Sequence, residues 1–112
     1  MTNPGGEGPS ELQPHDEAAE LAKQQTDPDR LMEGENPETE EPEDAEHWLR
    51  VYQELYAFKQ DLLGKLRTRL ASMDSADAKE EALADERLLT LELERFERRA
   101  DFWRRRRQAL AG

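Results

Sequence analysis

Six arginines near the carboxyl end of the chain are the residues best suited to chemistry. They are Arg98, Arg99, Arg104, Arg105, Arg106 and Arg107. A guanidinium group donates paired hydrogen bonds to a phosphate or a carboxylate. Phe102 and Trp103 lie between the arginines, and aromatic rings can stack on nucleic-acid bases. This arginine cluster is therefore suited to bind either a nucleic acid or an acidic protein segment.

Residues for catalysis or metal binding are scarce. His15 and His47 are the only histidines, and there is no cysteine. Asp44 lies three residues before His47, which is half of a helical carboxylate–histidine metal motif, but a second copy of the chain would have to supply the other half. No serine has a base placed nearby, and no glycine-rich phosphate loop follows a strand. We expect no catalytic residue, no metal, no cofactor and no enzyme activity.

The composition provides little apolar material for a core. Hydrophobic residues make up 35% and charged residues 38% of 112 residues, against about 45–50% and about 25% in typical domains. No apolar run reaches the roughly 18 residues of a membrane span, and no signal peptide is evident. We expect a soluble, cytoplasmic protein. Twelve arginines against four lysines, with no isoleucine, suggest a bacterial source with a GC-rich genome.

Charge divides the chain into two parts. Residues 1–46 contain two basic and fifteen acidic side chains, a net charge of −13, and residues 47–112 carry +2. All six prolines lie in the acidic part. Such a sequence buries too little apolar surface to offset the entropy of ordering it. We predict that residues 1–40 are a disordered acidic tail, in which a motif around Leu21 or Met32 could fold on a partner.

Helical periodicity dominates the remainder, residues 41–112. The spacing predicts a helix over about 43–73, a turn at 74–76 and a helix over about 76–109. Asp74 and Ser75 are good N-cap residues for the second helix. The apolar stripe of the first helix is Trp48, Val51, Tyr52, Leu55, Phe58, Leu62, Leu66, Leu70 and Met73. That of the second recurs every seven residues at Ala82, Leu89, Phe96, Trp103 and Leu110.

The two stripes have a common register. In an antiparallel hairpin, facing residues have a constant sum of residue numbers. The sum is 151 for Trp48 with Trp103, for Leu55 with Phe96, and for Leu62 with Leu89. Half of this sum falls between Ser75 and Ala76, where capping already predicts the turn. The fold class is therefore all-α, an antiparallel two-helix coiled-coil hairpin, with a single long helix as the alternative.

Two helices alone leave every core residue partly exposed. Small scaffolds of this kind commonly form oligomers or dock on a larger partner. The leading predicted assembly is a homodimeric four-helix bundle. We expect a non-enzymatic helical interaction or adaptor protein that self-associates or docks on a partner protein.

The predicted register brings the arginine cluster level with acidic residues. Residues 104–107 fall opposite residues 44–47, and cations also suit the carboxyl end of a helix. Phe96 and Trp103 are already required by the apolar stripe. We therefore expect neutralisation by the acidic part of the chain, or docking of an acidic protein. A small regulator that contacts nucleic acid or RNA polymerase through these arginines is the alternative.

Asp74 and Asp77 lie at the end of the predicted arm, which is roughly 40 Å long at about 1.5 Å per residue. This outline resembles the acidic-tipped coiled-coil arms of regulators that enter the secondary channel of bacterial RNA polymerase. Those proteins have Asp-x-x-Asp-x-Ala at the tip, whereas this chain has Lys79 at the last position and lacks their second globular part. The resemblance implies a polymerase contact through the two aspartates, whose other interpretation is helix capping.

Overall fold

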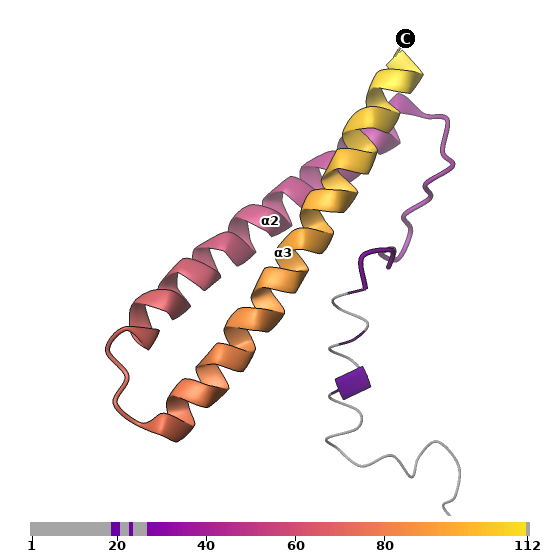
Figure 1. Cartoon of the computed structure of the whole chain (residues 1–112). Coiled ribbons are helices and arrows are strands. Elements are labelled where there is room, and N and C mark those ends of the chain that lie inside the picture. Colours follow the sequence, from indigo (N-terminus) through magenta and orange to yellow (C-terminus); the bar gives the residue numbers. More distant parts are fainter. Residues whose placement is uncertain (1–18, 21–22, 24–26, 112) are drawn as a thin grey trace, which may run out of the picture.

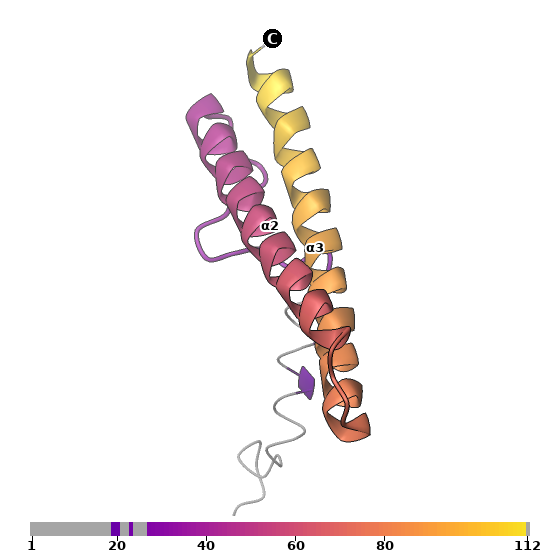
Figure 2. The ribbon, with the colours of Figure 1, turned by 90° about the vertical axis from the view of Figure 1, so that its left-hand side faces the viewer.

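The computed structural model describes residues 19–20, 23 and 27–111, and its main feature is a hairpin of two long helices (Figure 1). Helix α2 spans Pro42–Leu70 and helix α3 spans Ala76–Ala111. They run antiparallel, side by side, and residues 71–75 connect them (Figure 2). The predicted all-α hairpin is confirmed. Helix α2 ends three residues earlier than the periodicity predicts, and α3 extends two residues further.

Short polar side chains fix the beginning of each helix. Ser75 Oγ accepts a hydrogen bond from the backbone N–H of Ala78 at 3.3 Å, so Ser75 is the N-cap of α3. At the start of α2, Thr39 Oγ1 accepts from the Glu41 N–H at 3.2 Å and donates to Asp44 Oδ2 at 2.7 Å. Pro42 occupies the first turn, where its missing N–H costs nothing.

The predicted apolar stripe of α3 is confirmed at three of its five heptad positions, with Leu89 and Leu110 only half-buried, and that of α2 is partly wrong. On α3, Ala82, Phe96 and Trp103 are buried at the predicted heptad positions. On α2, the buried residues are Ala45, Leu49, Tyr52, Leu63 and Leu66. Phe58, which the sequence places in the stripe, is 59% exposed.

Adjacent apolar residues explain the error on α2. Trp48 and Leu49 form such a pair, as do Leu62 and Leu63. Periodicity cannot decide which member of each pair faces α3, because both members follow the same seven-residue spacing. In the structure Leu49 and Leu63 are buried, whereas Trp48 and Leu62 are only half-buried. The face of α2 turned toward α3 therefore keeps Tyr52 and Leu66 of the predicted stripe but has Leu49 and Leu63 in place of Trp48 and Leu62.

The register between the helices is confirmed to within three positions. Lys59 Nζ lies 3.1 Å from Glu92 Oε1, a pair with the expected sum of 151. The rings of Tyr52 and Phe96 have centroids 6.0 Å apart. The connection, residues 71–75, overlaps the predicted turn at 74–76 but begins three residues earlier, because α2 ends at Leu70.

Residues 27–41, which we call the acidic segment, pack against the hairpin. This corrects the prediction of a disordered tail as far as it concerns residues 27–40. Glu35 and Thr39 are buried, and Met32 packs on the core. From the start of α2 the acidic segment runs back along the hairpin toward the turn (Figure 1). The other residues of the predicted tail, including the motif around Leu21, lie outside the described part of the chain, except for residues 19–20 and 23, which are exposed.

Candidate functional site

The Glu35 carboxylate is the most deeply enclosed charged group of the acidic segment, with a side-chain exposure of 0%. Its Oε1 accepts from the Tyr52 hydroxyl at 2.5 Å and from the Met32 N–H at 2.8 Å. Its Oε2 accepts from Arg99 Nη2 at 2.7 Å and from Trp103 Nε1 at 2.7 Å. A more distant bond from Arg99 Nε, at 3.3 Å, completes the set. Both oxygens of a buried carboxylate are thus satisfied, as burial of a charge requires.

Three side chains of the hairpin, Tyr52, Arg99 and Trp103, form what we call the carboxylate pocket. Tyr52 comes from α2, and the other two come from successive turns of α3. Tyr52 and Trp103 are fully buried members of the hairpin core. The Arg99 guanidinium lies over the Phe102 ring, 4.6 Å from its centre, which is a cation–π contact. Rigid core packing therefore aims three donors at one point.

A tight turn presents Glu35 to the carboxylate pocket. The Glu35 N–H donates to the Met32 carbonyl at 3.0 Å, which closes a four-residue turn. Gly34, at its third position, has φ +86°, a conformation that a type II turn requires and that side chains with a Cβ rarely adopt. The Glu35 side chain folds back on the same turn through the Met32 N–H. The sequence Met32–Glu35 therefore forms a local unit with a projecting carboxylate.

The hydrogen bonds of the carboxylate pocket change the pKa values of Glu35 and Tyr52 in opposite directions. Burial alone raises the pKa of the Glu35 carboxyl, but its hydrogen-bond donors outweigh burial and hold this pKa below 4.5. Burial, followed by the hydrogen bond and the negative charge of Glu35, raises the pKa of Tyr52 from 10.0 to about 12. At neutral pH the site therefore holds an ionised glutamate and a neutral tyrosine.

We expect Tyr52→Phe to make the free energy of unfolding fall less steeply with pH above about 10. Because the folded-state pKa of Tyr52 is raised to about 12, the neutral phenol stabilises the fold below pH 10, and this contribution is lost as the pH rises through about 12. Denaturant unfolding at several pH values would measure it. Tyr56→Phe, which keeps Tyr52, should retain the wild-type slope; equal slopes in all three proteins would contradict the assignment.

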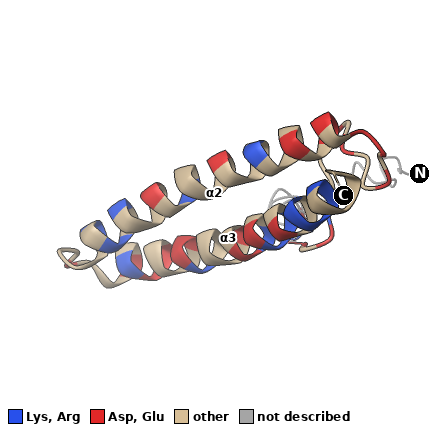
Figure 3. Cartoon of the chain, turned by 90° about the horizontal axis from the view of Figure 1, so that it is seen from above, with Lys and Arg blue, Asp and Glu red and all other residues tan. Residues whose placement is uncertain are grey.

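The arginine cluster lies at the open end of the hairpin, level with the acidic segment (Figure 3). Arg99 is buried in the carboxylate pocket. Arg98 Nη2 lies 3.1 Å from Asp29 Oδ1. Arg106 Nη2 donates to the backbone carbonyl of Thr39 at 2.7 Å. Three members of the cluster thus bind the acidic segment of the same chain.

The other members of the arginine cluster contact acidic residues of the helices. Arg104 and Arg105 pair with Asp101 one turn earlier on α3, at 3.5 and 3.1 Å. Arg107 approaches Glu46 of α2 at 4.0 Å. These pairs are exposed, and such pairs contribute at most about 1 kcal/mol each.

The opposite end of the hairpin holds the other two predicted residues. Asp74 and Asp77 are exposed, with Asp77 in the first turn of α3. The structure therefore divides the predicted residues between two distant ends of the hairpin. In the described part of the chain, no three His, Cys, Asp or Glu side chains are grouped to hold a metal ion, and no helix could span a membrane.

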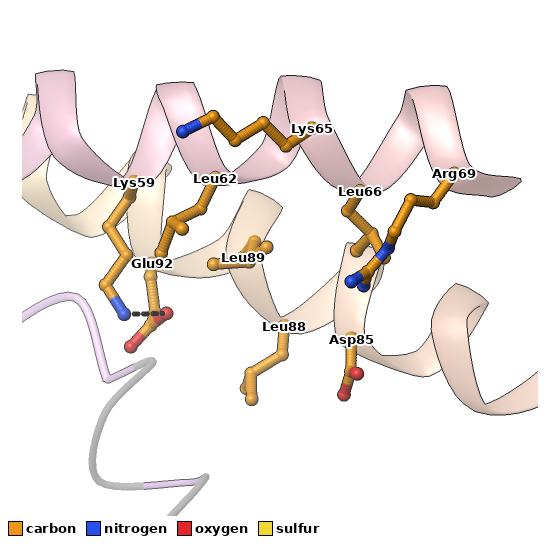
Figure 4. Close-up of a pocket in the computed structure, with 9 residues that line it drawn as sticks. All are labelled: Lys59, Leu62, Lys65, Leu66, Arg69, Asp85, Leu88, Leu89 and Glu92. Carbon is orange, nitrogen blue, oxygen red and sulfur yellow. Dashed lines mark ion pairs between the residues drawn. The ribbon is translucent and has the colours of Figure 1, made fainter.

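A groove between the helices lies nearer the turn than the carboxylate pocket does. Glu92 and Asp85 precede Arg99 by seven and fourteen residues, so all three lie on one face of α3. The groove measures about 410 Å³. We call it the tip groove (Figure 4), and its lining residues are Lys59, Leu62, Lys65, Leu66 and Arg69 of α2 with Asp85, Leu88, Leu89 and Glu92 of α3.

Sequence reasoning did not identify Glu35, because it is one of fifteen acidic residues in the first 46. The one local signal is Gly34 beside it, next to the apolar Leu31 and Met32, which is the composition of a turn with an anchor. No protein-family model, no curated protein and no solved structure matches this chain. Its site must therefore be interpreted from its own geometry.

Proposed function

We propose that this chain is a non-enzymatic helical interaction protein that self-associates through the tip groove into a four-helix bundle. The observation that carries this proposal is that the acidic segment covers only one half of the hairpin. The acidic segment packs over the open half, whereas Leu62 and Leu88 line a groove in the other half that nothing in the described part of the chain fills. A two-helix layer commonly needs a further layer to bury its apolar face.

The charges around the tip groove favour a second copy as the occupant. The α2 side carries Lys59, Lys65 and Arg69, and the α3 side carries Asp85 and Glu92 (Figure 4). A twofold axis parallel to the helices would place α2 of one copy over α3 of the other. Basic rims would then face acidic rims on both sides, in an isologous contact. A twofold axis across the helices would instead bring the two basic rims together.

Arg69 and Asp85 are the residues that this arrangement pairs. Lys59 already binds Glu92 at 3.1 Å, and Lys65 binds Asp61 at 2.9 Å. By the register, Asp85 is level with Leu66, which is about 4.5 Å along the helix from Arg69. In the parallel dimer, Arg69 meets Asp85 of the partner subunit, and the pair occurs twice.

We expect the full chain to dimerise in sedimentation equilibrium at micromolar concentrations, and a charge reversal to weaken the dimer. Arg69→Asp or Asp85→Arg should each raise the dimer dissociation constant by about tenfold or more, because each change creates two like-charge contacts. The double variant should restore it. A wild-type chain that remains monomeric at the highest soluble concentration would overturn self-association.

A charged substitution at an apolar position of the groove, with a matched control, tests whether the groove is the contact surface. Leu88→Glu places a charge in the lining of the groove and should abolish dimerisation. Leu91→Glu makes the same change at an exposed position of α3 outside the groove lining, and should not. If both variants weaken the dimer equally, the contact surface does not lie at the tip groove.

The nucleic-acid alternative receives less support from the contacts of the arginine cluster. A phosphate would have to compete with Glu35, Asp29 and Asp101 for the guanidinium groups of the cluster. Phosphate binding would also give an affinity that falls steeply with salt, by about 0.7–0.9 log units per log unit of salt for each contact. Salt-steep, submicromolar binding of RNA or duplex DNA by the full chain would promote this alternative.

A further inference from the structure

We infer that the carboxylate pocket is a recognition site for an acidic segment of a partner protein, and that residues 27–41 occupy this site in the isolated chain. The partner segment would place a glutamate on Tyr52, Arg99 and Trp103. This site is separate from the tip groove, so its test does not depend on self-association.

The pocket belongs to the hairpin and not to the segment that fills it. The Tyr52 ring is tilted by 45° to the Phe96 ring with centroids 6.0 Å apart, and Trp103 meets Phe102 edge to face at 5.0 Å. The side chain of Arg99 is only 10% exposed. Packing between α2 and α3 therefore holds the three donors in place, and a preorganised site binds a ligand with little ordering cost.

The acidic segment is attached mainly through polar contacts. Met32 is its one apolar residue packed on the hairpin core, and Leu31 remains 39% exposed. The remaining side-chain links are the exposed Arg98–Asp29 pair, the bonds from Arg106 to backbone carbonyls, and the bond from Thr39 Oγ1 to Asp44 at the start of α2. Among these links, the Glu35 carboxylate accepts the largest number of hydrogen bonds from the hairpin. A segment that enters the carboxylate pocket through one glutamate side chain can be replaced there by another segment that carries a glutamate.

Charge favours an acidic occupant. The acidic segment contains seven acidic residues and one basic residue, a net charge of −6, and residues 95–111 of α3 contain seven arginines and two acidic residues, a net charge of +5. A field of this sign steers acidic chains toward the open end of the hairpin. The turn adds specificity, because the Met32 N–H supplies a donor from within the ligand.

The chain's own acidic segment competes with a partner's segment for the carboxylate pocket, and it has the advantage of being tethered. A short flexible tether holds its ligand at an effective concentration on the order of millimolar. An external segment therefore gains access only when the tethered one leaves or when the external one has further contacts. The wild-type chain should bind an isolated acidic peptide weakly, and a chain with an unseated segment should bind it more tightly.

The test uses the full chain and a fluorescein-labelled synthetic peptide of residues 27–41. Gly34→Val unseats the tethered segment, because valine at φ +86° is strained, and it leaves every residue of the hairpin unchanged. By fluorescence anisotropy, this variant should bind the peptide at least about tenfold more tightly than the wild type. Glu35→Ala, a second way to empty the pocket, should behave in the same manner.

Two matched controls identify the pocket as the site. A peptide carrying Glu35→Gln should lose most of its affinity for the Gly34→Val chain, and so should the normal peptide for a chain that also carries Arg99→Met. Equal binding of the Glu and Gln peptides would show general charge attraction and overturn the proposal. Equal binding by wild-type and Gly34→Val chains, or no binding by either variant chain, would also overturn it.

The competing occupant of the carboxylate pocket is the acidic segment of a second copy of this chain, exchanged between the two copies. It would make the wild-type chain dimerise in a way that Glu35→Ala abolishes, whereas the dimer through the tip groove does not depend on Glu35. A Glu35-dependent dimer would overturn the assignment to a partner protein. Dimerisation that Glu35→Ala leaves unchanged, together with peptide capture, would support it.

Discussion

Replacement of Glu35 with alanine is expected to lower the free energy of unfolding by about 3 kcal/mol, the low end of the range for breaking a buried ion pair. The change removes the acceptor from three buried donors, among them the guanidinium of Arg99. The loss stays at the low end because the acidic segment can detach and let water reach Arg99. The helices should remain folded, so the helical circular dichroism should change little.

Urea unfolding and limited proteolysis would measure these two effects. In the Glu35→Ala variant, proteases should cut within residues 27–41 before they cut the helices. Glu33→Ala is the matched control, because Glu33 lies two residues away and is exposed. It should alter stability by less than about 0.5 kcal/mol, as is usual at a surface position. Equal losses in the two variants would mean that Glu35 does not anchor the segment.

The pH dependence should identify the charge of Glu35 as the cause. Because the pKa of Glu35 is lowered below 4.5 in the folded chain, its contribution to stability is present above that pH and is lost as the pH falls through the lower, folded-state value. The stability difference between wild type and Glu35→Gln should therefore be constant near neutral pH. It should shrink in acid.

The helical hairpin could be predicted from the sequence because local signals agree with one another. The heptad positions of α3 from Ala82 to Trp103, the Ser75 cap and the common register all indicate the same turn. Burial of apolar side chains determines these features, and it can be predicted from residue type and spacing. Adjacent apolar residues remove this information on α2, where both Leu62 and Leu63 fit the period.

The carboxylate pocket could not be predicted, because its components are far apart in sequence. Glu35 lies 64 residues from Arg99 and 68 from Trp103. Composition correctly indicates that the acidic segment buries little apolar surface. It does not reveal that one carboxylate meets three enclosed donors, which is a property of the folded hairpin. The arginine cluster could be identified, but its division between a buried Arg99 and exposed Arg98 could not.

Replacement of Phe96 with alanine should have one of the largest effects of any single change in the core. Phe96 is 4% exposed and packs with Tyr52 and Trp103 in the hairpin core. Truncation of a buried phenylalanine costs about 3–5 kcal/mol, because the removed atoms lose their contacts and the cavity closes only partly. The same cavity would loosen Tyr52, so the acidic segment should also become more sensitive to proteases.

Phe58→Ala provides the matched control, because it is the same chemical change at a position that the periodicity alone places in the same core. Phe58 is 59% exposed, so its truncation should cost less than about 1 kcal/mol. Urea unfolding of both variants, at a concentration low enough to keep the chain monomeric, gives the comparison. If α2 instead turned its Trp48, Leu55 and Leu62 face toward α3, the two losses would approach each other. A difference of several kcal/mol would therefore establish which face of α2 packs on α3, and with it the geometry that aims Tyr52 at Glu35.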